Sequence, residues 1–436
     1  TYWKTWELAF KNFYTPTPGS GFVSPFADAA FNKNIFFWDT AIMTMFLNTA
    51  HPLVPGISSL DNFYVKQHPT GEICREINRA SGVDFKLWRN TENLPLFSRW
   101  GFVEDTTRPC TPVRYLGREV PTPNPVLTLD ALNHPIAAWA ELESYRWTAD
   151  TSRLVQVILP LTKYYEALKK YIRQGNGLYI TDWASMDNSP RNSCLANGGT
   201  GIDISSEMVL FARNLADIST ILGHKQDAQQ FTNEADSLAT IINKKMWNER
   251  QQFYFDLTIN EEFCPVKTIA AFWTLVSKTA TPERAAWLAD QLQNPKTFGR
   301  LHPVPTLAAD EENYYPGGGY WSGSVWTATN TMVLKGLEAY GYDDLAEHIA
   351  RKHLDAMASV YKKTGTIWEN YAADGIKEGI QTNGKPVVRD MVGFSGVTPI
   401  LHFLWYGIGL RPDAPHNQLV WKIDSPERCG CKKFSS

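Results

Sequence analysis

Residues 324–363 read SVWTATNTMVLKGLEAYGYDDLAEHIARKHLDAMASVYKK, and this stretch points to the fold. On both sides of GYDD, at 341–344, apolar residues recur at the spacing of an α-helix. Two helices joined by so few residues must lie antiparallel as neighbours. The stretch therefore predicts a helical hairpin.

The hairpin pattern extends along the whole chain. Short polar joints also separate predicted helices at 148–152, which read TADTS, and at 223–226, which read GHKQ. Strand signals are sparse. Helical periodicity covers about twelve stretches, at 2–14, 36–50, 57–68, 128–148, 151–173, 203–223, 225–247, 268–279, 281–293, 324–341, 343–363 and 395–410.

Longer loops that are polar and rich in glycine and proline lie between the hairpins, at 69–127, 174–202, 294–323 and 364–394. Loops of this length without regular structure are uncommon unless they are functional. Because they occur on alternate joints, we expect them to gather at one end of the fold. Six hairpins in a ring then give an all-α protein, an (α/α)6 barrel with a cleft at its looped end.

The alternatives to the barrel are an irregular helical bundle and a helical solenoid. The sequence contains no repeated signature of the solenoid kind, so the barrel is our prediction. No shift in composition marks a domain boundary. We therefore predict one barrel domain over residues 1–436, with a short polar tail from about residue 424.

Composition excludes several classes of protein. The chain has 436 residues, of which 43% are hydrophobic, and its formal net charge of -3 offers no basic field to a nucleic-acid backbone. No apolar run reaches about eighteen residues, so we predict no membrane span. No signal peptide precedes Thr1 and there is no initiator Met, which we interpret as a mature or trimmed form. A periplasmic or secreted location and a cytoplasmic one both stay open.

Six cysteines are too few for a disulfide scaffold in a chain of this length. We expect the four scattered ones to be packed singly rather than paired; these are Cys74, Cys110, Cys194 and Cys264. Cys429 and Cys431 form a C-x-C in the polar tail. A tail disulfide or an engineered remnant explains that pair as readily as a metal site does.

Aromatic residues make up 13% of the chain, and 16 of them are Trp. A surplus of aromatic side chains is typical of clefts that stack against flat apolar faces, including those of sugar rings, although a large helical core is the alternative. In YYPGGGYWSGSVWTATN, at 314–330, we assign Tyr320 and Trp321 to a cleft and Trp326 to the core. The glycine run there allows the backbone to approach a ligand closely.

Carboxylates stand beside Trp at three places in or next to the long loops. These are Asp39 in FFWDT, Asp182 and Asp187 in DWASMDNSPR, and Glu369 in TIWENY. A glycosidase needs two carboxyl groups whose pKa values are held apart, which aromatic walls and a nearby cation can achieve. Each acid alone is more often a cap, a turn residue or a surface charge. Together they indicate a sugar site.

Further residues belong to this predicted site because of their position in the sequence. Trp183 lies within DWAS, and Arg191, four residues after Asp187, is a candidate cation. His134, in NHPIAAW at a loop-to-helix junction, is expected near the cleft, and Asn370 follows Glu369 directly. We expect no metal and no cofactor. GIQTNGKP resembles a phosphate loop but has Pro386 where Ser or Thr is required, and neither H-E-x-x-H nor G-x-S-x-G occurs.

Four separated segments occur in the order found in one known family. MDNSPR, GGYWSGSVW, WENY and FSGVTPILHFLW resemble signature segments of glycoside hydrolase family 63 and its trehalase relatives. The resemblance extends from FFWDT to the last helix and covers nearly the whole chain. It implies an inverting α-glycosidase on an (α/α)6 barrel.

The resemblance also implies roles for individual residues. Asp187 corresponds to the general acid and Glu369 to the general base. Trp38 and Asp39 match the Trp–Asp pair that holds the terminal sugar, and Trp321 matches the aromatic residue of the Y-W-x-G segment.

The chain departs from the family pattern at several positions. Ser185 stands where members often have Gly, and Ser322 where many have Arg. The basic residue that many carry shortly before Trp–Asp is missing from NIFFWD, and we expect no β-rich N-terminal domain of the kind common in the family. In the family the sugar specificity is usually for glucose. We expect these departures to affect that specificity more than the type of reaction.

We therefore predict hydrolysis of a terminal α-linked glucose or mannose from an oligosaccharide or a small glycoside, with inversion. Inversion places the two carboxyl groups roughly 6.5–9.5 Å apart, which leaves room for the attacking water. Two alternatives use the same barrel: a glycoside phosphorylase or epimerase, and a carbohydrate-binding protein without activity. A barrel enzyme acting on terpenes or lipids would need an apolar cavity and runs of metal-binding acids, and no such runs occur in the sequence.

Overall fold

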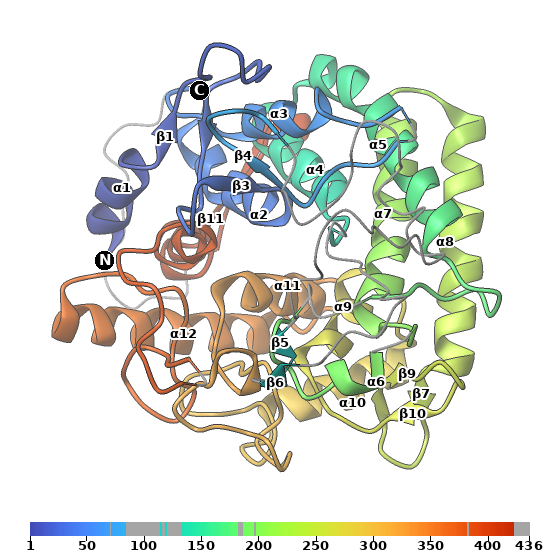
Figure 1. Cartoon of the computed structure of the whole chain (residues 1–436), viewed down its shortest axis with the longest axis vertical. Helices are drawn as coiled ribbons and strands as arrows, with labels where there is room; N and C mark the ends of the chain where they lie inside the picture. The colour runs from blue at the N-terminus through green and yellow to red at the C-terminus, as the bar shows by residue number, and fades with distance from the viewer. Residues whose placement is uncertain are drawn as a thin grey trace.

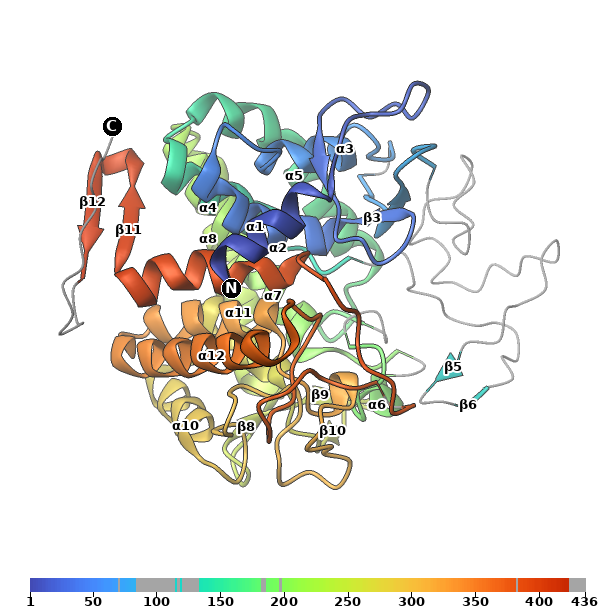
Figure 2. The same cartoon turned by 90° about the vertical axis from the view of Figure 1, so that its left-hand side faces the viewer.

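The computed structural model describes residues 1–69, 71–83, 114–115, 118–119, 133–181, 186–195, 198–381 and 383–422. Helices dominate this part of the chain, and the fold is the predicted (α/α)6 barrel (Figures 1 and 2). A helical element occurs within each of the twelve stretches that periodicity predicts.

In the described part of the chain, outer and inner elements alternate and make six consecutive pairs. The pairs, outer member first, are α1 (Tyr2–Phe10) with α2 (Phe37–Leu47), η2 and α3 (Ile57–Leu60 and Asp61–Tyr64) with α4 (Ala137–Thr148), α5 (Thr151–Tyr171) with α7 (Ile202–Ile221), α8 (Lys225–Lys245) with η4 and α9 (Ile269–Phe272 and Trp273–Val276), α10 (Pro282–Gln293) with α11 (Thr327–Glu338), and α12 (Asp343–Thr364) with η7 (Thr398–Ile408).

The inner members contact one another in a closed circuit. α2 packs on α4, α4 on α7, α7 on α9 and α9 on α11, and η6 (Phe394–Gly396), just before η7, contacts both α11 and α2. Among the outer helices, α5 packs on α7 and α12 packs on η7, while α8 and α12 also pack on α7 and α11, the inner helices that precede them in the chain. α7 and α8 lie side by side in Figure 1, and α11 and α12 are stacked in Figure 2.

The sequence explains which helices are inner and which are outer. α2, FWDTAIMTMFL, is apolar on nearly every face and buries ten of its eleven residues. A helix that is hydrophobic all round belongs in the interior of a large fold. α12 instead buries a single stripe that includes Ala346, Ile349, Ala350, His353 and Met357, with charged residues on the other face. That pattern is typical of a helix between core and solvent.

Local signals set the short joint between α4 and α5. α4 ends where Ala149 adopts a left-handed conformation with φ of 53°. Asp150 then caps α5, since its side chain accepts hydrogen bonds from the backbone N–H groups of Ser152 and Arg153. An Asp at this position satisfies helix donors that would otherwise lack partners.

Two predicted helices are shorter than periodicity indicated. The stretch at 128–148 becomes helical only at Ala137, and residues 128–132 lie outside the described part. The stretch at 57–68 forms one short 3-10 turn followed by one α-helical turn. In the first case Pro135 precedes the helix, consistent with the residue before a proline avoiding the helical region.

Among the described residues, the strands form six small antiparallel pairs. They are β1 (Phe13–Tyr14) with β2 (Phe26–Ala27), β3 (Asn34–Phe36) with β4 (Glu76–Asn78), β5 (Arg114–Tyr115) with β6 (Arg118–Glu119), β7 (Trp247–Asn248) with β8 (Phe253–Tyr254), β9 (Asp256–Leu257) with β10 (Phe263–Cys264), and β11 (Leu410–Asp413) with β12 (Gln418–Trp421). β11 and β12 project on the side of the barrel away from β3 (Figure 2).

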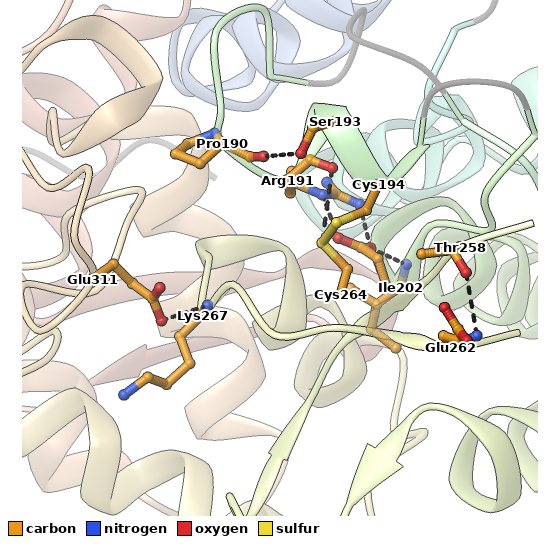
Figure 3. Close-up of a disulfide and its surroundings, with 11 residues drawn as sticks. Pro190, Arg191, Ser193, Cys194, Ile202, Thr258, Glu262, Cys264, Lys267 and Glu311 are labelled. Carbon is orange, nitrogen blue, oxygen red and sulfur yellow. Dashed lines mark hydrogen bonds and ion pairs between the residues drawn. A yellow bond between two sulfur atoms is a disulfide. The ribbon is translucent and has the colours of Figure 1, made fainter.

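The expectation that Cys194 and Cys264 are unpaired is wrong. Their sulfur atoms form a disulfide that joins the short helix α6 (Asn192–Leu195) to β10 (Figure 3). The two cysteines are 70 residues apart in the sequence, so no local pattern indicates the pairing. Cys74 is buried, whereas Cys110, Cys429 and Cys431 lie outside the described residues, as does the predicted tail.

No helix in the described ranges combines the length and the apolar character that crossing a membrane requires.

Candidate active site

A cavity of about 320 Å³ is enclosed between the inner helices and the long loops. Each of the four long loops contributes at least one side chain to its lining: Arg75, Asp187, Tyr320 and Phe394. The loops therefore do gather at one end of the barrel, as their alternation along the chain predicted. The inner helices supply a further part of the wall, including Trp38 and Asp39 from α2, Asp203 and Glu207 from α7, and Trp273 from α9.

Six of the predicted site residues line this cavity: Trp38, Asp39, His134, Asp187, Tyr320 and Trp321. Glu369, Arg191 and Asn370 are not among the lining residues in the described part of the chain. Trp183, like Asp182, lies outside the described residues.

Asp39 lies in the first turn of α2 with its side chain largely buried. Burial raises its pKa to about 7, because a carboxylate without water is destabilised. The nearby charges of Glu76 and Glu369 raise the pKa further, while Arg75 and a backbone N–H oppose the shift. The raised pKa favours the protonated carboxyl group, which can donate as well as accept a hydrogen bond.

Asp187 is an exposed acid that lines the cavity. Its loop is held from within by Asn192, whose side-chain amide donates to the carbonyl oxygens of Met186 at 2.7 Å and Asp187 at 3.2 Å. The residue after it, Asn188, bonds to the 319–322 segment. The turn-forming residues around Asp187 thus hold a carboxyl group that faces the cavity.

Glu369 is a buried acid whose two carboxylate oxygens both accept hydrogen bonds. The Tyr320 hydroxyl donates to Oε1 at 2.9 Å, and the backbone N–H of Val388 donates to Oε2 at 3.0 Å. Burial raises the pKa of Glu369, and these two donors counteract part of the rise because they stabilise the anion. Glu369 is not among the described residues that line the cavity, and its hydrogen bond with Tyr320 connects it to a residue that does.

Tyr320 lines the cavity together with Asp187 and Asp39, and its hydroxyl donates to Glu369. Its pKa is raised well above the usual value, first by burial and then by the charges of Asp187, Glu369 and Asp39. Its backbone has φ of 62°, a conformation that is strained for a residue with a side chain.

An aromatic wall covers one side of the cavity. The rings of Trp321 and Trp326 are stacked, with centroids 4.4 Å apart, and Trp326 also contacts Phe394 at 5.4 Å. The ring of Trp38 also contacts that of Phe394, with centroids 6.2 Å apart. Trp326 is buried as predicted for a core residue, but it also lines the cavity.

Arg191 does not act as a cation beside Asp187. Its side chain is completely buried, and its guanidinium group pairs with Asp203 and Asp256, with a distance of 2.7 Å from Nε to Oδ2 of Asp256 (Figure 3 shows its place beside the disulfide). Burial opposes ionisation of Asp203, but the Arg191 charge outweighs it and lowers the pKa of that carboxyl group. Through these two pairs, Arg191 links the loop that carries Asp187 to α7 and β9.

Asn370 is also fully buried, and it contributes to the wall beside Glu369 rather than to the cavity surface. His134 does line the cavity. Its Nδ1 pairs with Glu207, and although burial favours the neutral imidazole, the Glu207 carboxylate outweighs burial and raises the pKa of His134.

Sequence reasoning missed Asp203 and Glu207. They lie four residues apart on α7, on the face that lines the cavity, within a helix that is otherwise almost entirely buried. Two acids at that spacing on a buried helix were a usable signal, since buried carboxylates need partners and often mark a functional site.

No group of three or more His, Cys, Asp or Glu side chains suited to a metal ion is found among the described residues.

The sequence model of the mannosylglycerate hydrolase MGH1-like glycoside hydrolase domain matches residues 101–375. A protein of Borreliella burgdorferi, described as uncharacterized, is 30% identical over 326 residues, which is 72% of this chain and 68% of the relative. The chain belongs to the MGH1-like glycoside hydrolase family.

Solved structures show the fold of this family member independently. The glycoside hydrolase family 63 mannosylglycerate hydrolase of Thermus thermophilus, in complex with glucose, has a TM-score of 0.66 at 16% identity, and the match covers 92% of this chain and 99% of that one. Neutral trehalase Nth1 of Saccharomyces cerevisiae has a TM-score of 0.62 at 15% identity, covering 90% and 76%. The recognition of family 63 and its trehalase relatives from short motifs is thus confirmed.

The segment NIFFWD of this glycoside hydrolase has no basic residue beside the Trp–Asp pair. Arg75 supplies a cation near this pair from another part of the chain. The β3–β4 pairing sets Phe36 opposite Glu76, and the backbone N–H of Phe37 donates to the carbonyl of Arg75 at 2.9 Å. Arg75, the residue before β4, therefore lines the cavity with Asp39 although the two are far apart in the sequence.

Proposed function

We propose that this glycoside hydrolase removes a terminal α-linked glucose or mannose from an oligosaccharide or small glycoside, with inversion at the anomeric carbon. The observation that carries the proposal is a hydrogen bond to the buried carboxylate of Glu369 from Tyr320, which lines an aromatic-walled cavity together with Asp187 and Asp39. Two carboxyl groups in different environments are what glycoside hydrolysis needs.

Asp187 acts as the general acid in this mechanism. It lines the cavity on an exposed loop, where it can protonate the glycosidic oxygen as the bond to the anomeric carbon breaks. Asn188 and Asn192 hold the loop on either side of the carboxyl group.

Glu369 acts as the general base and takes a proton from the attacking water. It must be ionised to do so, and the donors from Tyr320 and Val388 favour the ionised form. Inversion requires its carboxyl group to lie roughly 6.5–9.5 Å from that of Asp187, and this separation is part of the proposal.

Trp38, Asp39 and Trp321 hold the terminal sugar. Asp39, with a pKa of about 7, exchanges hydrogen bonds with sugar hydroxyls, and the Trp rings cover the apolar faces of the ring. We include small glycosides because one similar structure, the Thermus mannosylglycerate hydrolase, is described in complex with Tris and D-glycerate.

The test is hydrolysis of a panel of aryl α-glycosides and α-linked disaccharides of glucose and mannose. Asp187→Asn and Glu369→Gln run beside the wild type, with the exposed residues Asp227→Asn and Glu249→Gln as matched controls. We expect turnover by the wild type and both controls, and loss in both site variants. Activity that survives both site substitutions would refute the assignment.

A glycoside phosphorylase is the second candidate, and the position of Glu369 behind Tyr320 is the observation that favours it. A phosphorylase uses phosphate in place of activated water and needs no general base. Turnover that requires added inorganic phosphate would establish this alternative, and binding without turnover in either condition would leave a carbohydrate-binding protein.

A further inference from the structure

Asn188, the residue after Asp187, ties the loop of the proposed acid to the segment 319–322. Its Nδ2 donates to the carbonyl of Gly319 at 3.0 Å, and its Oδ1 accepts from the backbone N–H of Trp321 at 2.9 Å. Ser322 adds a contact of 3.3 Å from Nδ2 to its Oγ. One side chain thus bonds to both neighbours of Tyr320.

The same segment holds the proposed base. Tyr320 stands between the two backbone groups that Asn188 binds, and its hydroxyl donates to Glu369 at 2.9 Å. Its own backbone N–H donates to the carbonyl of Ile380 at 3.0 Å. A continuous path of covalent and hydrogen bonds therefore runs from Asp187 through Asn188 and Tyr320 to Glu369.

This path joins segments that are far apart in the sequence. Asn188 lies 133 residues from Trp321, and Tyr320 lies 49 residues from Glu369. The left-handed backbone of Tyr320, with φ of 62°, costs free energy. The bond from Tyr320 to Ile380 holds this residue independently of Asn188, and the bonds from Asn188 to Gly319 and Trp321 attach the loop of the acid to the same segment.

We propose that Asn188 is a positioning residue that sets the place of the general acid relative to the general base, a role that rests on the proposed function. The cavity lining in the described chain does not include Asn188, so it acts through its neighbours rather than on the sugar. A shift of about 1 Å in a reacting group can lower a rate about 100-fold, so a contact that fixes this distance affects catalysis strongly.

The leaving group of the substrate separates positioning of the acid from loss of the fold. An α-linked disaccharide needs its leaving oxygen protonated by Asp187, whereas fluoride departs from an α-glycosyl fluoride with little need of a proton. In Asn188→Ala the base remains held by Tyr320 and Val388. We expect kcat/KM for the disaccharide to fall about 10- to 100-fold, which is at most the lower end of the roughly 100- to 10,000-fold that general acid catalysis supplies, and for the fluoride less than about 3-fold.

Asn62 offers a matched control. Its Oδ1 accepts from the backbone N–H groups of Val23 and Ser24, and its Nδ2 donates to the carbonyl of Ser24 at 2.9 Å, so it makes the same kind of bridge away from the cavity. Asn62→Ala should lower the melting temperature as Asn188→Ala does, but should leave the ratio of the two kcat/KM values unchanged.

Two further variants keep the test decisive if Asn188→Ala does not fold. Asn188→Asp keeps the side-chain acceptor and loses the donor. Ser322→Ala removes only the two longer contacts of the Ser322 hydroxyl, with Nδ2 of Asn188 at 3.3 Å and with its carbonyl oxygen at 3.4 Å. Both should shift the ratio in the same direction as Asn188→Ala, with the smaller effect in Ser322→Ala.

Equal losses on both substrates, or no loss on either, would overturn the positioning role while the wild type stays active. A wild type that hydrolyses neither substrate would overturn the proposed function itself, and the role of Asn188 with it.

Discussion

The hydroxyl of Tyr320 donates a hydrogen bond of 2.9 Å to Oε1 of Glu369. This bond connects a residue that lines the cavity to an acid buried behind it. It stabilises the ionised carboxylate, which is the form a general base needs, against the effect of burial.

Tyr320→Phe should therefore move the acid limb of the kcat/KM profile to higher pH. Loss of the donor raises the pKa of Glu369, so a larger fraction of the base is protonated at any pH below neutrality. A hydrogen bond to a charged group contributes about 1.5–3 kcal/mol, which corresponds to a shift of about one to two pH units. Rates on the preferred glycoside between pH 4 and 9 measure it.

Tyr64→Phe is the matched control for that profile. Tyr64 also donates to a buried carboxylate, Oε1 of Glu141 at 2.9 Å, but this pair is not among the described residues that line the cavity. The acid limb of the Tyr64→Phe profile should coincide with that of the wild type. If the acid limb of the Tyr320→Phe profile also coincides with that of the wild type, the role of Glu369 is contradicted.

Asp39→Asn should change how stability depends on pH. The folded pKa of Asp39, about 7, lies above the usual value of 3.8, so the folded protein holds the proton more tightly than the unfolded chain. Its contribution is complete below pH 3.8 and is lost as the pH rises through 7. The contribution of Asp39 to the free energy of unfolding changes by roughly 4 kcal/mol at most over this pH range.

The free energy of unfolding of Asp39→Asn relative to wild type should therefore rise between pH 4 and pH 8 in denaturant titrations. Asp343→Asn, an exposed acid in the first turn of α12, is the control for loss of a carboxylate near a helix N-terminus. Parallel curves for wild type and Asp39→Asn would show that Asp39 titrates as an ordinary acid.

Arg191→Met should destabilise the fold. The substitution leaves the carboxylates of Asp203 and Asp256 buried without their cation. Breaking a buried ion pair in this way costs about 3–5 kcal/mol. Arg213→Met, at a more exposed pair with Asp236, should cost no more than about 1 kcal/mol. A variant of Arg191 with wild-type stability but weaker sugar binding would restore the role that sequence proximity predicted.

Loss of the Cys194–Cys264 disulfide should lower stability by about 2–4 kcal/mol, because the bond constrains the intervening chain in the unfolded state. The double variant Cys194→Ala/Cys264→Ala and the wild type treated with dithiothreitol should have the same melting temperature. Alkylation followed by mass spectrometry shows whether the bond is present. Two alkylated thiols at these positions in the untreated protein would rule the bond out.

The barrel was predictable because its signal is local. Inner helices such as α2 are apolar all round and outer helices such as α12 carry one apolar stripe, and short joints such as TADTS require antiparallel neighbours. The acids beside Trp were predictable for a related reason, since Asp39 and Asp187 stand in short motifs that lie at one cavity.

The remaining parts of the site depend on contacts between distant segments. Arg75 reaches Asp39 only through the β3–β4 pairing, and Cys194 meets Cys264 across 70 residues. Arg191 was assigned to the wrong partners because closeness in sequence to Asp187 does not decide where a long side chain points. Its charge is taken up by acids from α7 and β9.

The most direct test of the central claim is the anomeric form of the first sugar released, followed by proton NMR within the first minutes of hydrolysis. Our account predicts the β-anomer from an α-glycoside with the wild type, and no release with Asp187→Asn or Glu369→Gln. Release of the α-anomer first would contradict inversion and the pairing of Asp187 with Glu369 as acid and base.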